Sequence, residues 1–193
     1  VYSDATNGWI PITDQDVTDV PLAGNDNGIF AYGGGPVNMS NIVSDAGVMG
    51  SDVTGVGTAR AALAACEYGG DKGIFAYGTT GSLVNMSNLV SNAGVIGTDV
   101  TGVGTARRML AACSYGSDKG IFGYGYTSSS VGMTNLVSNA GVVASDVTGV
   151  GTARYAPGAC EYGEDKAIFG YGNASPATAV TNLVSNVGVV SSD

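Results

Sequence analysis

The side chains of this chain that could carry chemistry are carboxylates, thiols and a few cations, because it contains no histidine. Without an imidazole, Ser-His-Asp catalysis, Cys-His catalysis and histidine metal sites are excluded. Paired carboxylates such as Glu67 and Glu161 could hydrolyse a glycosidic bond, but no unique neighbour sets any of them apart. We therefore expect no enzyme, no catalytic residue, no cofactor and no metal site, and keep a carboxylate-dependent hydrolase as an alternative.

The cations follow a repeated pattern. The segment DVTGVGTAR occurs three times, 47 residues apart, and each copy begins with an aspartate and ends with an arginine. A guanidinium in this place could donate hydrogen bonds to backbone carbonyls or to one of these carboxylates. The pattern predicts a structural role in every repeat, with ligand binding as the alternative. The residues concerned are Asp52, Arg60, Asp99, Arg107, Asp146 and Arg154.

The three cysteines also share one repeat position, since Cys66, Cys113 and Cys160 lie 47 residues apart. Three thiols cannot all pair within one chain. A cysteine copied in this way is typical of a small buried hydrophobic side chain. A metal or redox role is the alternative.

These residues lie in a chain built almost wholly of repeats. The motif DK-G/A-IF recurs at Asp71, Asp118 and Asp165, and a diverged copy begins near Asp26. A period of about 47 residues indicates a repeat architecture. We expect a single repeat domain over 1–193, with an N-terminal strand region at 1–24 and repeats that start near 25, 71, 118 and 165.

Each repeat contains four strand signals separated by Gly, Ser, Asn and Asp. In one repeat they fall at Arg107–Gly116, Gly120–Gly125, Met133–Asn139 and Val142–Asp146. Apolar residues at helical spacing are not sustained anywhere. Four strands in a unit of 40–50 residues are typical of a propeller blade. We predict an all-β, four-bladed β-propeller, with a closed ring favoured over the alternative, a segment of a longer tandem β array.

The repeats differ most in the loop after the second strand. These loops are rich in Ser, Thr, Asn and Gly, and variable loops on a constant scaffold often carry recognition. Their side chains could bind a hydroxyl-rich ligand, and Tyr126 could stack on a sugar ring; neutral variation is the alternative. The candidate ligand-binding residues are Thr79, Ser82, Tyr126, Ser128, Ser129 and Asn173.

The charge of the chain bears on its partners. A formal net charge of −9 argues against nucleic acid and anionic membrane surfaces, both of which call for a basic face. No apolar run approaches the roughly 20 residues that a membrane-spanning helix needs. We expect neither nucleic-acid binding nor membrane insertion.

An arginine-led strand ending in YG, then an Ile-Phe strand ending near Gly-Tyr-Gly, resembles a kelch-type blade. The sequence pattern DKGIFGYG…TNLVSN.GVV.SDVTGVGTAR is similar to the tandem repeats of bacteriophage virion proteins, which are often described as tail-fibre or structural proteins. The resemblance implies an extracellular, non-enzymatic virion protein in a tail fibre or similar appendage that attaches to the host. Its implied partners are other virion proteins, copies of itself and host-surface glycans. The alternative is a secreted or cell-surface carbohydrate-binding lectin or adhesin.

Overall fold

The structure is a computed structural model that describes residues 2–4, 8, 9 and 26–193. These residues form strands, turns and loops, and none of them belongs to a helix that could cross a membrane. The all-β prediction is therefore confirmed. In the N-terminal region 1–24, the described residues form a short antiparallel pair of β1 (Tyr2–Asp4) and β2 (Gly8–Trp9).

The repeats form four small antiparallel sheets, one for each copy of the motif. The first sheet has two strands, β3 (Gly28–Ala31) and β4 (Ser40–Val43). Each of the others has three strands in chain order. They are β5 (Ala64–Tyr68), β6 (Lys72–Ala76) and β7 (Ser87–Val90); β8 (Ala111–Tyr115), β9 (Lys119–Gly123) and β10 (Thr134–Val137); and β11 (Gly158–Tyr162), β12 (Lys166–Gly170) and β13 (Thr181–Val184).

The Asp-Lys motif closes the first hairpin of each full repeat. In the third repeat, Tyr115 of β8 pairs with Lys119 of β9, so three residues make the turn. Gly116 and Ser117 both have positive φ there, a conformation that such tight turns need. Lys119 forms an ion pair with Asp118, 2.6 Å away, and Asn139 donates to the same carboxylate. The Asp-Lys motif therefore stabilises this turn.

The predicted fourth strand of each repeat is only partly formed. In the third repeat, the outer segment touches β10 at two isolated bridges, Val137 with Val143 and Thr134 with Val147. Three positions separate the bridged residues on β10 and four separate them on the outer segment, so one extra residue breaks the ladder, as in a β-bulge. Asn135 fills this gap by donating to the carbonyl of Ala144, 3.0 Å away. The strand predicted at Val142–Asp146 is therefore present only as isolated bridges on either side of this extra residue.

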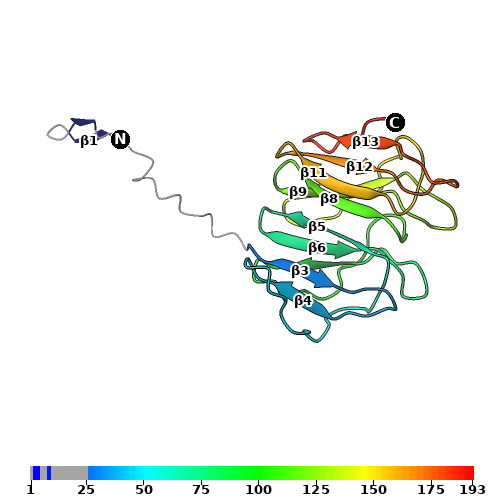
Figure 1. Ribbon diagram of the computed structural model, residues 1–193, viewed down its shortest axis with the longest axis horizontal. Coiled ribbons are helices and arrows are strands. Elements are labelled where there is room, and N and C mark those ends of the chain that lie inside the picture. Colours follow the sequence, from blue (N-terminus) through cyan, green and yellow to red (C-terminus); the bar gives the residue numbers. More distant parts are fainter. Residues whose placement is uncertain (1, 5–7, 10–25) are drawn as a thin grey trace.

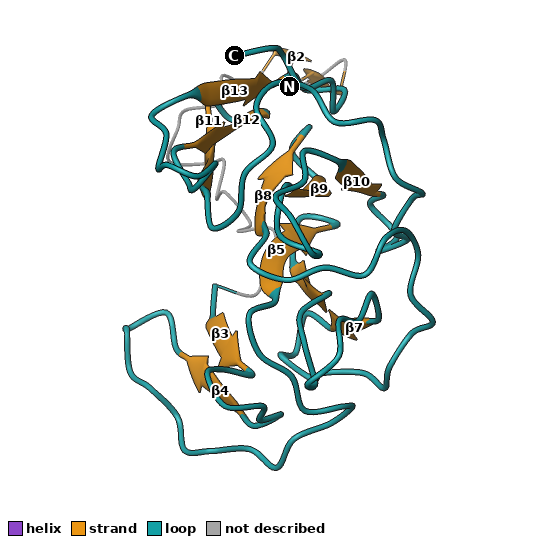
Figure 2. Ribbon diagram, turned by 90° about the vertical axis from the view of Figure 1, so that its right-hand side faces the viewer, coloured by secondary structure: helices purple, strands orange, loops and turns teal. Residues whose placement is uncertain are grey.

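The four repeat sheets follow one another in a row, from β3–β4 at one end to β11–β13 at the other (Figure 1). The first strands of successive full repeats lie side by side, β5 against β8 and β8 against β11. Long loops connect the sheets (Figure 2). A closed ring is not seen among the described residues, since the first and last sheets lie at opposite ends of the row. The closed-ring expectation is therefore not confirmed.

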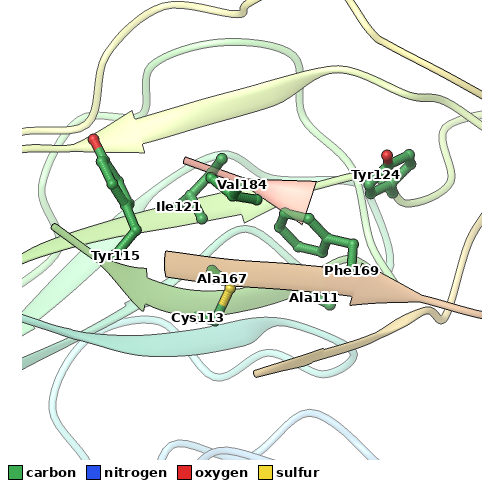
Figure 3. Close-up of a cluster of buried hydrophobic side chains, with 8 residues drawn as sticks. All are labelled: Ala111, Cys113, Tyr115, Ile121, Tyr124, Ala167, Phe169 and Val184. Carbon is green, nitrogen blue, oxygen red and sulfur yellow. The ribbon is translucent and has the colours of Figure 1, made fainter. Parts of the chain in front are cut away.

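The hydrophobic core lies between neighbouring sheets. Between the third and fourth repeats, side chains from both sheets meet in one buried cluster (Figure 3). Apolar surface is thus removed from water where repeat meets repeat, and this burial drives the association of the sheets. The cluster consists of Ala111, Cys113, Tyr115, Ile121, Tyr124, Ala167, Phe169 and Val184.

Candidate functional site

The repeated arginines lie in the most buried places of the molecule. Arg107 is fully buried, and its guanidinium donates to the carbonyl of Tyr124 (2.8 Å), to that of Thr105 (3.2 Å) and to the Asn135 side-chain oxygen (2.7 Å). Its guanidinium carbon lies 4.3 Å from the centre of the Tyr77 ring in the preceding repeat. Burial lowers the pKa of Arg107, and Tyr77 and Asp146 oppose this shift. Arg107 thereby joins two repeats and the loop between them.

Arg60 and Arg154 occupy equivalent positions. Both are fully buried, and they lie 4.4 Å and 3.8 Å from the ring centres of Tyr32 and Tyr124. Arg60 donates to the Phe75 carbonyl and Arg154 to the Thr152 carbonyl. The nitrogens of these two side chains that lack a hydrogen-bond partner among the described residues are Nε and Nη1 of Arg60 and Nε of Arg154, and they are buried rather than aimed at solvent. A buried cation against carbonyls and an aromatic face belongs to a scaffold rather than to a ligand site.

Three aspartates spaced 47 residues apart, Asp99, Asp146 and Asp193, each bind the copy of the repeated segment that precedes them. Asp99 accepts hydrogen bonds from the amide (3.1 Å) and the hydroxyl (2.6 Å) of Thr58, which lies 41 residues earlier, and from Asn88. Asp146 does the same with Thr105, and Asp193 with Thr152. These contacts tie the start of each repeat to its end, which explains why the nine residues recur.

Ion pairs connect these aspartates to the buried arginines. The distances are 3.8 Å from Arg60 to Asp99 and 3.9 Å from Arg107 to Asp146. Burial alone would raise the pKa of Asp146, but hydrogen bonds from Thr105 and Asn135, with the charge of Arg107, lower it overall. Asp52 differs from the others: its hydrogen bond comes from Asn41.

Cys66 and Cys113 pack at the boundaries between repeats, whereas Cys160 of the last repeat is exposed, so the expectation of a buried side chain was wrong for Cys160. The Cys113 side chain lies in the buried cluster of Figure 3 beside Ala167, and burial raises its pKa to about 12. Burial also raises the pKa of Cys66. Both thiols are therefore protonated and weakly nucleophilic at neutral pH. Among the described residues, no group of three or more cysteines, aspartates or glutamates could hold a metal ion.

A cavity of about 260 Å³ lies between the first two repeat sheets, lined by residues that include Cys66, Glu67 and Asp71. Burial raises the pKa of Glu67, and Glu161 and Asp71 add to this shift. Asp71 is held in an ion pair with Lys72, 2.6 Å away. The walls thus present one carboxyl group with a raised pKa and a carboxylate already paired with a lysine.

The candidate ligand-binding residues lie in the equivalent loops of three repeats. Thr79, Tyr126 and Asn173 occupy the same position in successive loops, and each pairs with the residue that follows the buried arginine of its own repeat. In the second repeat, the Thr79 hydroxyl donates to the carbonyl of Ser82, so this part of the loop binds itself. In the fourth repeat, Asn173 accepts from the amide of Ser175.

Three larger side chains meet where one of these loops contacts the next repeat, and we call them the tyrosine cluster: Arg108, Tyr126 and Tyr155. The rings of Tyr126 and Tyr155 meet edge to face with centroids 5.3 Å apart. The guanidinium of Arg108 lies 5.8 Å from the centre of the Tyr126 ring. Its Nε is buried and has no hydrogen-bond partner among the described residues. The cluster offers an aromatic surface and a cation at the junction of two repeats.

The tyrosine cluster draws together some of the predicted residues and leaves others apart. Ser128 and Ser129 are exposed in the same loop as Tyr126. Asn173 is connected to the tyrosine cluster through Tyr155, because the backbones of these two residues form two hydrogen bonds with each other. Thr79 and Ser82 lie in the loop of the second repeat. Sequence reasoning missed Tyr155, although a signal existed: the residue after the repeated arginine is Ala61, Arg108 or Tyr155 in successive copies.

Comparison with known proteins adds no further constraint on this site. A scan against models of protein families finds no match, and neither does a search of curated proteins. The role of the tyrosine cluster therefore rests on its geometry.

Proposed function

We propose that this protein is a non-enzymatic structural and recognition module of a bacteriophage virion, in a tail fibre or similar appendage that contacts the host surface. The resemblance of its repeats to virion proteins supports the setting. The observation that supports recognition is the tyrosine cluster, where side chains that differ between repeats gather on a scaffold that does not differ. Under this proposal the protein is extracellular and forms part of the virion.

We also propose that the four repeats are kelch-like blades set in an open row. Each full repeat is a three-stranded antiparallel sheet with an outer segment bridged to it. The first strands β5, β8 and β11 lie next to one another, as the strands nearest the axis of a propeller do. An array of this kind suits an elongated appendage, because each unit contacts only its neighbours.

The proposed ligand is a hydroxyl-rich glycan of the host surface. Aromatic faces stack on sugar rings, and Arg, Ser and backbone groups donate hydrogen bonds to hydroxyls. Arg108 provides a half-buried guanidinium beside the Tyr126 ring, and Ser128 and Ser129 provide exposed hydroxyls in the same loop. One such site is weak, but several copies on one particle raise the avidity by about 10²–10⁴ where geometry permits.

The test is adsorption. Particles that carry Tyr126→Ala together with Ser128→Ala and Ser129→Ala should adsorb less to host cells while they assemble normally. Tyr126→Phe is the matched control, because it keeps the ring and removes only the hydroxyl group. Unchanged adsorption of the triple variant would mean that these loops vary neutrally and that the protein is purely structural.

A secreted or cell-surface lectin would use the same site, so binding alone does not separate the two functions. A virion protein is present on particles in a defined copy number, whereas a lectin is free or tethered to a cell. Quantitative mass spectrometry of purified particles from the native source tests this directly. A chain found only in the particle-free fraction would favour the lectin.

A further inference from the structure

Among the described residues, one cation has no partner for its charge. The chain has seven basic residues, and all of them lie in the part that the structure describes. Each lysine forms an ion pair with the aspartate before it, and the buried arginines form ion pairs with aspartates or hydrogen bonds to carbonyls. The side chain of Arg108 has neither kind of contact with any described residue. Arg108 therefore carries a charge that no described residue neutralises.

The sequence around Arg108 is poor in acidic residues. Between residues 100 and 160 the acidic residues are Asp118 and Asp146. Asp118 is paired with the lysine that follows it, and Asp146 lies 3.9 Å from Arg107. Both carboxylates are therefore already engaged, although the whole chain has a formal net charge of −9. In an acidic protein, an unneutralised cation is the place where an anionic group meets attraction rather than repulsion.

The scaffold does not require an arginine at this position. The equivalent residues of the second and fourth repeats are Ala61 and Tyr155. All three positions make the same backbone bridge to the loop of their own repeat, with amide-to-carbonyl distances of 2.9 Å for Ala61, 3.1 Å for Arg108 and 3.0 Å for Tyr155. The third repeat packs against a described repeat on each side, through contacts of β8 with β5 and β11. The charge of Arg108 is therefore specific to this junction and is not part of the repeated framework.

The position of the guanidinium leaves its far end open. Nε of Arg108 is buried without a hydrogen-bond partner among the described residues, whereas its two terminal nitrogens are not closed off from the surface. The guanidinium carbon lies 5.8 Å from the centre of the Tyr126 ring, farther than the buried arginines lie from their rings. The attraction between a cation and a ring extends to about 6 Å. The ring therefore leaves the charge of Arg108 available to another group.

We propose that the tyrosine cluster binds an acidic sugar. Its carboxylate or phosphate group lies on the terminal nitrogens of Arg108, and its ring packs against Tyr126 or Tyr155. This inference rests on the glycan recognition proposed above and names the chemical class of the glycan. A guanidinium donates two parallel hydrogen bonds to either anion. The exposed hydroxyls of Ser128 and Ser129 in the same loop contact the hydroxyls of the sugar.

Three sugars that differ at one carbon test the proposal. They are galactose, galacturonate, in which the exocyclic carbon is a carboxylate, and galactose phosphorylated on the hydroxyl of that carbon; the corresponding glucose series is the second set. Binding is measured from amide chemical shifts of the 193-residue chain at physiological ionic strength. The acidic sugars should bind at least about tenfold more tightly than the neutral one and shift the amides of the tyrosine cluster. The tighter of the two acidic sugars identifies the anionic group.

Arg108→Gln removes the charge and keeps a long polar side chain. It should weaken the binding of the acidic sugars by about 10- to 100-fold, as expected for hydrogen bonds to a charged group, and that of the neutral sugar much less. The second repeat has alanine at this position, so the variant should keep a melting temperature close to that of the wild type. Tyr126→Ala should weaken the binding of all three sugars.

Lys166→Gln is the matched control for net charge. It removes the same charge from an exposed ion pair in the fourth repeat and should leave sugar binding unchanged. Equal affinity for acidic and neutral sugars, or an equal loss of affinity with Arg108→Gln and Lys166→Gln, would overturn this proposal and leave glycan recognition in place. Binding of none of the sugars would overturn both this proposal and the glycan recognition on which it rests.

Discussion

Removal of Arg107 should destabilise the protein more than removal of any neighbouring surface cation. Arg107→Ala leaves two backbone carbonyls and the Asn135 side-chain oxygen without their donor, and it removes the cation from the Tyr77 ring. It also leaves Asp146 without its positive neighbour. Two of these acceptors belong to the buried Tyr124 and Asn135, and a buried acceptor left without its donor costs about 1–3 kcal/mol, so the expected cost is about 2–6 kcal/mol.

This cost is large beside the total stability of a domain, about 5–15 kcal/mol. For a chain of this size, each kcal/mol lowers the melting temperature by about 2–4 °C. The expected fall for Arg107→Ala is therefore about 4–24 °C in a calorimetric or circular-dichroism melt. The melting temperature of Arg107→Lys should lie between those of Arg107→Ala and the wild type. Lysine keeps the charge but lacks the planar guanidinium group that reaches several acceptors.

The adjacent Arg108 supplies the control. It lies in the tyrosine cluster, and its guanidinium is 5.8 Å from the nearest ring centre. Arg108→Ala should change the melting temperature less than Arg107→Ala. If Arg107→Ala melted within a few degrees of the wild type, or no lower than Arg108→Ala, the buried guanidinium would not be holding the repeats together.

Two further predictions concern titrating groups. The folded-state pKa of Asp146 lies below its unfolded value of about 3.9, so its stabilising contribution is present above about pH 4 and is lost as the pH falls towards the folded-state pKa. In denaturant melts, Asp146→Asn should therefore differ most from the wild type at pH 7 and less at pH 3; an equal difference at both would contradict the assignment. A thiol reagent at pH 8 should label the exposed Cys160 rapidly and the buried Cys113 slowly, since burial raises the pKa of Cys113 to about 12; rapid labelling of Cys113 by peptide mapping would refute this.

The repeat period and the strand class could be predicted from the sequence because they depend on local patterns. The Ile-Phe strands and the Asp-Lys turns recur with fixed spacing, and the structure has strands and turns at those places. The outer strand was overestimated because its residues favour β structure. A β-bulge depends on register against a partner strand, and propensity does not reveal it.

The site was harder to predict, for a different reason. Tyr126 stood out as the aromatic residue in a variable loop, but its neighbour Tyr155 comes from the next repeat. Their contact depends on how two sheets pack, which no local pattern encodes. The partners of the repeated aspartates were equally hidden, because Asp99 binds Thr58 across 41 residues rather than a neighbour in its own segment.

The sameness of the repeats has a consequence for folding. Each buried arginine stacks on the tyrosine of the repeat before it, but every repeat offers nearly the same tyrosine and the same carbonyls. A strand could therefore join the wrong sheet with few lost contacts. Doubling the loop that must close costs only about 0.6 kcal/mol, so distance along the chain gives little protection against such misassembly. Positions where the copies differ, such as Gly120 and Ala167, then distinguish the correct neighbour, because a Cβ atom at Gly120 would lie 2.5 Å from the sulfur of Cys66.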